Sequence, residues 1–138
     1  MQSKLNPYLS FKDTARQAME FYQSVFGGKL AMNTFKEFQA SDDPSEDEKI
    51  MHAILEAENG ITLMAADTPN RMEYRDGTNI SISLSGDNEA ELRRYFEKLS
   101  VGGMVTQPLE KAPWGDTFGM CTDQFGINWM VNVAGQKA

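Results

Sequence analysis

His52 is the only histidine in the chain, and histidine is the residue type that most readily changes charge near neutral pH. It falls in a segment, 50–58, that we expect to be a strand. A catalytic base also needs an orienting partner and a substrate proton within reach. Asp67, Asp116 and Asp123 are candidate partners, although the sequence places none of them beside His52. We interpret His52 as a hydrogen-bonded strand histidine near the wall of a cleft, with a role as general base kept as the alternative.

Cys121 is the only cysteine, so no disulfide can form within the chain, which is typical of a reducing compartment. It lies between Met120 and Thr122 in an expected strand. No basic residue next to it would lower the pKa of the thiol, so we expect a buried, unreactive cysteine.

The acidic composition argues against binding to nucleic acid. The 138 residues include 20 Asp and Glu against 13 Lys and Arg, whereas nucleic-acid binding relies on clustered Lys and Arg. No apolar run approaches the roughly 18 residues that span a bilayer, and the first residues do not have the pattern of a signal peptide. We predict a cytoplasmic protein with no nucleic-acid or membrane partner.

An internal repeat indicates how the chain is organised. FYQSVFGGKL in the first half matches FEKLSVGGMV at an offset of 75 residues, and NGITLM matches FGINWM at an offset of 66. The matched positions of the first pair are Phe21 with Phe96, Gly27 with Gly102, and Gly28 with Gly103. Two copies of one module are the simplest explanation.

Each copy has the same predicted order of elements, a strand, a helix and three further strands. In the first copy, period-two alternation predicts a strand at 5–11, and later strands at 29–38, 50–58 and 61–66. In the second copy the strands are predicted at 79–84, 104–109, 118–122 and 127–133. Thr14 with Gln17 forms a capping box before the first helix, with Asp13 as a competing cap, and Asp87 can cap the second helix. The Asn59-Gly60 pair predicts a hairpin turn.

The apolar stripes of the two helices must cover the apolar faces of the opening strands. The stripe of the first helix comprises Ala15, Ala18, Met19, Tyr22, Val25 and Phe26. The stripe of the second comprises Leu92, Tyr95, Phe96 and Leu99. The predicted fold class is α+β, with two β-α-β-β-β modules whose mixed, curved sheets enclose a cleft. We expect one domain over 1–138, made of module 1–70 and module 77–138, with 68–77 as the linker.

The segment 41–48, SDDPSEDE, carries five acidic residues. It lacks the glycine and the regular oxygen spacing of a calcium loop. We predict a solvated, mobile connection between two strands.

Five segments run through almost the whole chain: NPYLSF, FYQSVFGG, KIMHAIL, WGDTFG and DQFGINWMVN. Together they resemble the PhnB-like branch of the vicinal oxygen chelate superfamily, which includes glyoxalase I, extradiol dioxygenases, and bleomycin and fosfomycin resistance proteins. The resemblance implies two β-α-β-β-β modules and, in the metal enzymes of the superfamily, a divalent ion held by His, Glu or Gln from the first and last strands of the modules.

The residues at those ligand positions here are Asn6, Met64, Asn79 and Met130, with Asn6 taken as equivalent to Asn79 and Met64 as equivalent to Met130. Amide and thioether groups are a poor set of ligands for either a hard cation or zinc. We therefore expect no metal and no other cofactor.

The polar strand faces implied by this fold would hold water or a ligand, because an apolar core does not tolerate many unsatisfied polar groups. The polar residues of those faces are Asn6, Tyr8, Ser10, Asn79, Ser81, Ser83, Asn128 and Asn132. Trp114 either plugs the core or lines the cleft or a dimer contact. The predicted ligand-binding residues are Asn6, Tyr8, His52, Met64, Asn79, Ser81, Trp114, Phe118 and Met130.

The function predicted is metal-free binding of a small organic molecule that is uncharged or mildly polar. One alternative is a metal-free isomerase that transfers a proton through His52, and another is a metal-dependent lyase or dioxygenase with displaced ligands. A third alternative is an interaction partner with no ligand. Whether the protein is an enzyme stays open, with binding favoured. The resemblance also implies a homodimer.

Overall fold

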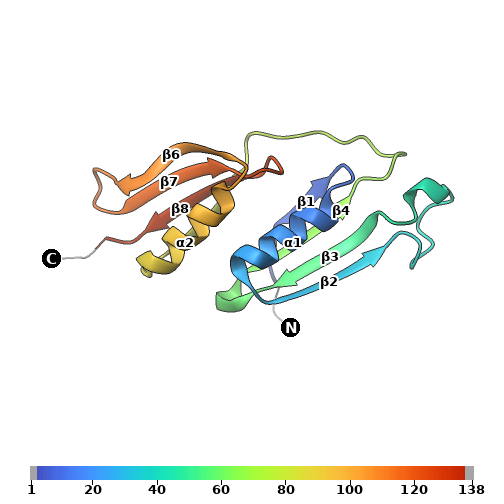
Figure 1. Cartoon of the computed structure of the whole chain (residues 1–138), viewed down its shortest axis with the longest axis horizontal. Coiled ribbons are helices and arrows are strands. Elements are labelled where there is room, and N and C mark those ends of the chain that lie inside the picture. The colour runs from blue at the N-terminus through green and yellow to red at the C-terminus, as the bar shows by residue number, and fades with distance from the viewer. Residues whose placement is uncertain (1–2, 136–138) are drawn as a thin grey trace. The chain divides into compact units, whose positions relative to one another are not determined.

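The structure is a computed structural model that describes residues 3–135. The chain divides into two compact units, Met1–Arg75 and Asp76–Ala138. Each unit has the predicted β-α-β-β-β order, so the α+β fold class and the duplicated module are confirmed (Figure 1). In the described part of the chain, neither main helix is long and apolar enough to cross a membrane.

The first unit has one mixed four-stranded sheet and one main helix. Its elements are β1 (Tyr8–Phe11), α1 (Ala15–Phe26), β2 (Lys29–Thr34), β3 (Ile50–Glu56) and β4 (Thr62–Asp67). The strand order is β1-β4-β3-β2, in which β1 is parallel to β4 and the other neighbours are antiparallel. Two short 3-10 helices, η1 (Pro44–Glu46) and η2 (Glu58–Gly60), lie in the loops.

The second unit repeats this arrangement. Its elements are β5 (Ile82–Gly86), α2 (Glu89–Ser100), β6 (Met104–Lys111), β7 (Thr117–Thr122) and β8 (Asn128–Val133). The strand order is β5-β8-β7-β6, again with one parallel pair, β5 with β8. Each unit therefore has the same mixed topology.

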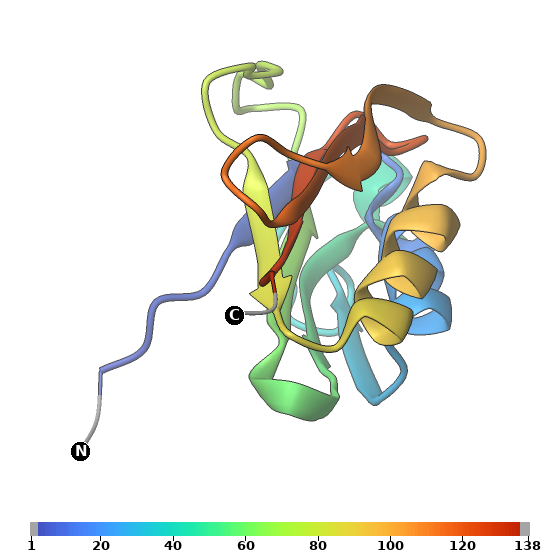
Figure 2. The ribbon, with the colours of Figure 1, turned by 90° about the vertical axis from the view of Figure 1, so that its left-hand side faces the viewer.

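One face of each sheet is covered by the helix of its own unit, as Figure 2 shows for α1, drawn in blue. All the residues of the two predicted helix stripes are buried. Opposite α1, the strands contribute buried apolar side chains such as Phe11, Leu55 and Leu63. Because successive strand residues point to opposite faces, the remaining strand residues line the face away from the helix.

The first strand of each unit begins later in the chain than the sequence pattern predicts. β1 begins at Tyr8 rather than at residue 5, and Leu5 is fully exposed. Pro7 has no N–H to donate, so it contributes only a carbonyl, which accepts from Met64. β5 begins at Ile82, and Ile80, which was expected on its apolar face, is 78% exposed.

The later strands also differ from their predicted bounds. β2 ends at Thr34 rather than at residue 38, because the register shifts between Asn33 and Thr34 and the Glu37 carboxylate binds both residues in a turn. β3 ends at Glu56 and β6 continues to Lys111. Asn59 and Gly60 both have positive φ, 63° and 76°, which confirms the predicted turn.

The predicted position of the first helix cap is confirmed, but its side-chain hydrogen bond does not form, and the predicted cap of the second helix is wrong. Thr14 occupies the N-cap position of α1 but makes no capping hydrogen bond through its side chain. The backbone N–H of Ala15 instead donates to Asp67, at the far end of β4. Asn88, and not Asp87, caps α2 by accepting a hydrogen bond from the backbone N–H of Glu91.

The sheet register corrects the predicted alignment of the two modules. Tyr8 pairs with Met64, and Ser83 pairs with Met130, so Tyr8 is equivalent to Ser83. Counting back two residues makes Asn6 equivalent to Ser81 and not to Asn79.

The two helices are separated by a different number of residues from the opening strands of the two modules. α2 begins and ends 74 residues after α1, which aligns Phe96 with buried Tyr22 rather than with half-buried Phe21. Gly28 and Gly103 are equivalent to each other and are again 75 residues apart. Each lies against the backbone at the end of the strand that precedes the last hairpin of its own unit.

Candidate functional site

The face of the first sheet away from α1 carries a continuous row of side chains across all four strands. Tyr8 pairs with Met64, Met64 pairs with Ile54, and Ile54 pairs with Ala31. Ser10 and Ala66, which pair with each other, follow in the next row. We call this surface the open face of the first unit.

His52 lies on this open face beside Tyr8. The centres of the two rings are 6.2 Å apart, and the rings are tilted at 57°. Partial burial raises the pKa of the Tyr8 hydroxyl above its ordinary value. Three of the residues predicted to bind a ligand, Tyr8, His52 and Met64, therefore lie on one surface, as the period-two pattern of their strands requires.

The three carboxylates considered as partners for His52 have other hydrogen bonds. Asp67 accepts from the backbone N–H of Ala15 with one oxygen and of Ile50 with the other, both at 2.9 Å. Asp123 accepts from the indole N–H of Trp129 and from two backbone N–H groups. Among the described residues, no carboxylate forms a hydrogen bond or ion pair with His52.

Asp116 is the third of these carboxylates. It accepts hydrogen bonds from the Asn132 side chain and from the backbone N–H of Gly135. The bond from Asn132, followed by that from Gly135, lowers the pKa of Asp116. These contacts hold the turn after β6 to the end of β8.

A pocket of about 320 Å³ adjoins the open face of the first unit. Its apolar lining comes from Tyr8, Phe35, Ala40, Met51, Ala66, Pro69 and Met72. Ser10, Asp67, Thr68 and Arg71 supply its polar groups. Such a combination of apolar walls and a few polar groups is typical of small-molecule sites.

Most of these lining residues are not predicted by the sequence pattern. Thr68, Pro69, Arg71 and Met72 lie in the segment 68–77 that we expected to be a linker. Phe35 was assigned to a strand but lies beyond its end, where it is buried. The one sequence feature that could have indicated this pocket is the pair of apolar residues Pro69 and Met72 around the cation Arg71, and this signal is weak.

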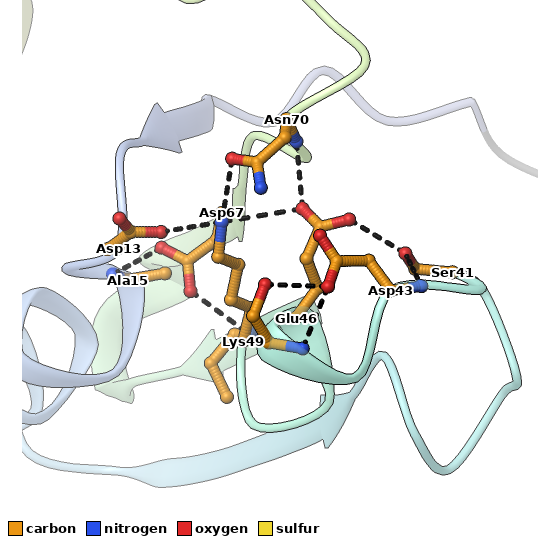
Figure 3. Close-up of polar contacts among 10 residues, drawn as sticks. Asp13, Ala15, Ser41, Asp43, Glu46, Lys49, Asp67 and Asn70 are labelled. Atoms are coloured by element: carbon orange, nitrogen blue, oxygen red, sulfur yellow. Dashed lines mark hydrogen bonds and ion pairs between the residues drawn. The ribbon is translucent and has the colours of Figure 1, made fainter.

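The wall of the pocket is fixed by a polar cluster around Glu46 (Figure 3). Glu46 accepts hydrogen bonds from the Ser41 hydroxyl at 2.7 Å and from the backbone N–H of Asn70 at 2.8 Å. Lys49 forms ion pairs with Asp13 at 2.9 Å and Glu46 at 3.4 Å. This cluster joins the loop after β2 to the segment after β4.

The predicted solvated loop 41–48 is therefore wrong in one respect. Glu46 is only 3% exposed, although the other acidic side chains of the loop are more accessible. The hydrogen bonds from Ser41 and then from Asn70 lower the pKa of Glu46. The Asp13 side chain, followed by Glu46, raises the pKa of Lys49, so both groups stay charged around neutral pH.

The second unit has an equivalent open face. Phe118 pairs with Asn132, and Met120 pairs with Met130, all on the face away from α2. Trp114 is 63% exposed and contacts the Phe118 ring edge-on, with 5.8 Å between ring centres. Trp114 therefore does not plug the core of its unit.

The remaining predicted residues lie outside the strands. Asn6 precedes β1 and is half-buried, and Asn79 and Ser81 precede β5 and are exposed. The pocket of the first unit takes only Tyr8 from the predicted set. Cys121 is buried as predicted, and burial raises the pKa of its thiol.

The residues at the superfamily's ligand positions do not fit a divalent metal. With the corrected register these positions hold Asn6, Met64, Ser81 and Met130, and Asn79 lies two residues before Ser81. Amide, hydroxyl and thioether groups lack the carboxylate, imidazole or thiolate that such ions prefer. Within residues 3–135, no three His, Cys, Asp or Glu side chains gather where they could hold a metal ion.

Comparison with known proteins supports the fold and the family. The family model of the Glyoxalase/Bleomycin resistance protein/Dioxygenase superfamily matches residues 4–131. Protein YjdN of Escherichia coli strain K12 is 28% identical, over 96% of this chain and 97% of its own length.

Two solved structures are similar over nearly the whole chain. Protein PA1353 from Pseudomonas aeruginosa is 39% identical, with a TM-score of 0.84 over 98% of this chain and 100% of its own. The PhnB protein from Bacillus cereus is 25% identical, with a TM-score of 0.77 over 96% of this chain and 100% of its own.

Proposed function

Because the chain belongs to the Glyoxalase/Bleomycin resistance protein/Dioxygenase superfamily, we propose that it binds a small organic molecule without a metal ion or other cofactor. The observation that carries this proposal is the pocket of about 320 Å³ beside the open face of the first unit. Its size lies at the lower end of the range of about 300–1,000 Å³ for small-molecule sites, so the ligand is small.

The surfaces around this pocket suit an organic ligand. Phe35, Met51 and Met72 give it apolar walls, and methionine adapts its shape to irregular ligands. Ser10 and Thr68 add polar groups for orientation. The open face with Tyr8 and Met64 continues from the pocket and extends the surface that a ligand can contact.

The side chains at the superfamily's metal-ligand positions support binding without a metal ion. The residues at the ligand positions are neutral, and two of them are thioethers. Lyase or dioxygenase chemistry that depends on a divalent ion would need ligands from other residues, so we place it below binding.

A second candidate function is proton transfer by His52, for example in an isomerisation. The observation that favours it is the close approach of the Tyr8 and His52 rings on one open face. A tyrosine hydroxyl and an imidazole are both groups that move protons in enzymes. This candidate ranks second because the three carboxylates that could orient His52 are hydrogen-bonded elsewhere.

We further propose that the protein works in the cytoplasm as a homodimer. A single buried cysteine suits a reducing compartment. Strand β6 is the last strand of its sheet and exposes Met104 by 67% and Val105 by 44%, which gives an apolar edge for a second copy. Sedimentation velocity tests this: a species of 15.5 kDa at micromolar concentration contradicts the homodimer.

A thermal-shift screen of small organic molecules, with and without a chelator, tests the binding function. Binding predicts that ligands raise the melting temperature equally in both conditions. The variant His52→Ala separates binding from proton transfer. If the ligand binds the unchanged protein and His52→Ala with the same affinity, and neither protein converts it, binding alone is supported. If the unchanged protein converts the ligand and His52→Ala does not, proton transfer by His52 is supported.

A further inference from the structure

Only two of the residues that line the pocket of the first unit are charged, Asp67 and Arg71. Asp67 is 5% exposed, and each of its two oxygens accepts a backbone N–H. Both oxygens of its carboxylate are therefore already engaged in holding the fold together. Arg71 is therefore the charged lining residue that can pair with a ligand.

The guanidinium of Arg71 has no acidic partner within the described part of the chain. No carboxylate among residues 3–135 forms an ion pair with it, although Asp42, Asp43 and Glu46 line an adjoining depression together with Arg71. Two of these three acids have partners of their own. Glu46 binds Ser41, Asn70 and Lys49, and Asp43 accepts from the backbone and hydroxyl of Ser45.

The backbone that carries Arg71 is anchored on both sides. Asn70 donates its backbone N–H to Glu46, and its side-chain oxygen accepts from Lys49 at 3.3 Å. The backbone N–H of Met72 closes a turn onto the carbonyl of Pro69. Arg71 is thus held at the pocket by its neighbours and not by a partner for its own charge.

We infer that the ligand carries an anionic group, of the carboxylate type, that pairs with Arg71 while its apolar part packs against Phe35, Met51 and Met72. This inference rests on the proposed binding function and names the ligand class for that site. Arginine binds carboxylates through two parallel N–H donors, so it adds orientation as well as attraction. The net charge of −7 opposes anions at long range, so attraction of an anion to this pocket depends on Arg71, the one positively charged residue among those that line it.

Matched pairs of acid and amide test this inference. The probes are benzoate against benzamide and indole-3-acetate against indole-3-acetamide, which differ in charge but little in shape. Backbone amide shifts of the full chain, followed by NMR during titration, give the affinity and the location of binding. Because Arg71 is exposed, we expect the acids to bind about two- to fivefold more tightly than the amides, with saturable shifts at Ser10 and Thr68.

The variant Arg71→Gln removes the charge at the pocket, and Arg75→Gln is its matched control. Arg75 is exposed, pairs with Glu73, and does not line the pocket. We expect Arg71→Gln to abolish the preference for acids and to leave the affinity for the amides unchanged. Arg75→Gln should retain the full preference.

The outcomes separate this inference from the proposed function. If acids and amides bind equally to the unchanged protein, or if Arg71→Gln leaves the preference intact, the anionic ligand class is wrong and the binding function stands. If no probe shifts Ser10 or Thr68 at millimolar concentration, both the inference and the binding function at this pocket are contradicted.

Discussion

Asp67, the last residue of β4, accepts a hydrogen bond at 2.9 Å from the backbone N–H of Ala15, the first residue of α1. Its other oxygen accepts from the backbone N–H of Ile50 at the start of β3. One buried carboxylate therefore joins the helix to two strands. Asp67→Asn keeps the shape but replaces one acceptor with a donor. We expect it to lower the free energy of unfolding by about 1–3 kcal/mol, measured by urea denaturation.

Asp76→Asn is the control for this substitution, because Asp76 is exposed. A change within about 0.5 kcal/mol is expected there, as for most surface substitutions. Equal stability of Asp67→Asn and Asp76→Asn would show that the link between α1, β3 and β4 contributes nothing.

Gly103 is packed so closely that a Cβ atom there would collide with the carbonyl oxygen of Thr122 and the backbone of Asp123. We expect Gly103→Ala to destabilise the second unit by about 1–3 kcal/mol, as overpacking does, in chemical denaturation experiments. Gly77→Ala is the control, since the nearest atom to its Cβ is 3.9 Å away. A neutral Gly103→Ala would contradict the close approach.

The duplicated fold could be predicted because its signals are local. The apolar stripe from Ala15 to Phe26 follows the helical period within twelve residues, and the Asn59-Gly60 turn needs only two. The start of β1 could not be predicted, because it depends on pairing with β4, more than 50 residues away. The cap of Ala15 was missed for the same reason.

The candidate site was predictable only in part. Tyr8, His52 and Met64 share a face because strand side chains alternate, a rule that sequence alone can apply. Arg71 was missed because its segment contains no strand or helix period. Buried Glu46 was missed because its partners Lys49 and Asn70 come together only in the folded chain.

The titration of Glu46 gives a prediction about pH. Hydrogen bonds from Ser41 and Asn70 hold the pKa of Glu46 below its ordinary value of about 4.5. Its contribution to stability is therefore complete above that ordinary value and is lost as the pH falls through the lower pKa of the folded protein. The Asn70 backbone amide, which donates to Glu46, should report this step by NMR.

Glu46→Gln should remove the acidic step from the Asn70 amide signal, and Glu48→Gln should leave it unchanged. Glu48 is an exposed acid two residues away, which makes it a matched control. If Glu48→Gln removes the step as completely as Glu46→Gln does, the assignment of the titration to Glu46 is wrong.

The two tryptophans have opposite environments. Trp129 is 1% exposed and donates its indole N–H to Asp123 at 2.8 Å, whereas Trp114 is 63% exposed. We expect Trp129→Phe to cost about 1–3 kcal/mol, because it leaves a buried acceptor without its donor. Trp114→Phe should change stability by less than about 0.5 kcal/mol.

Iodide quenching of fluorescence checks the same two environments. The Trp114→Phe variant, in which Trp129 is the remaining indole, should resist the quencher, and the Trp129→Phe variant should be quenched strongly. Equal quenching of the two variants would contradict this difference in burial.

The central claim is that the pocket of the first unit binds a small organic molecule without a metal ion. Titration of the chelator-treated full chain with small aromatic acids and amides, followed by backbone amide NMR, tests it most directly. We expect saturable shifts at Ser10, Thr68 and Arg71, and none at Asp87 on the second unit. Shifts that are absent from these three residues, or that arise only after a divalent metal is added, would contradict it.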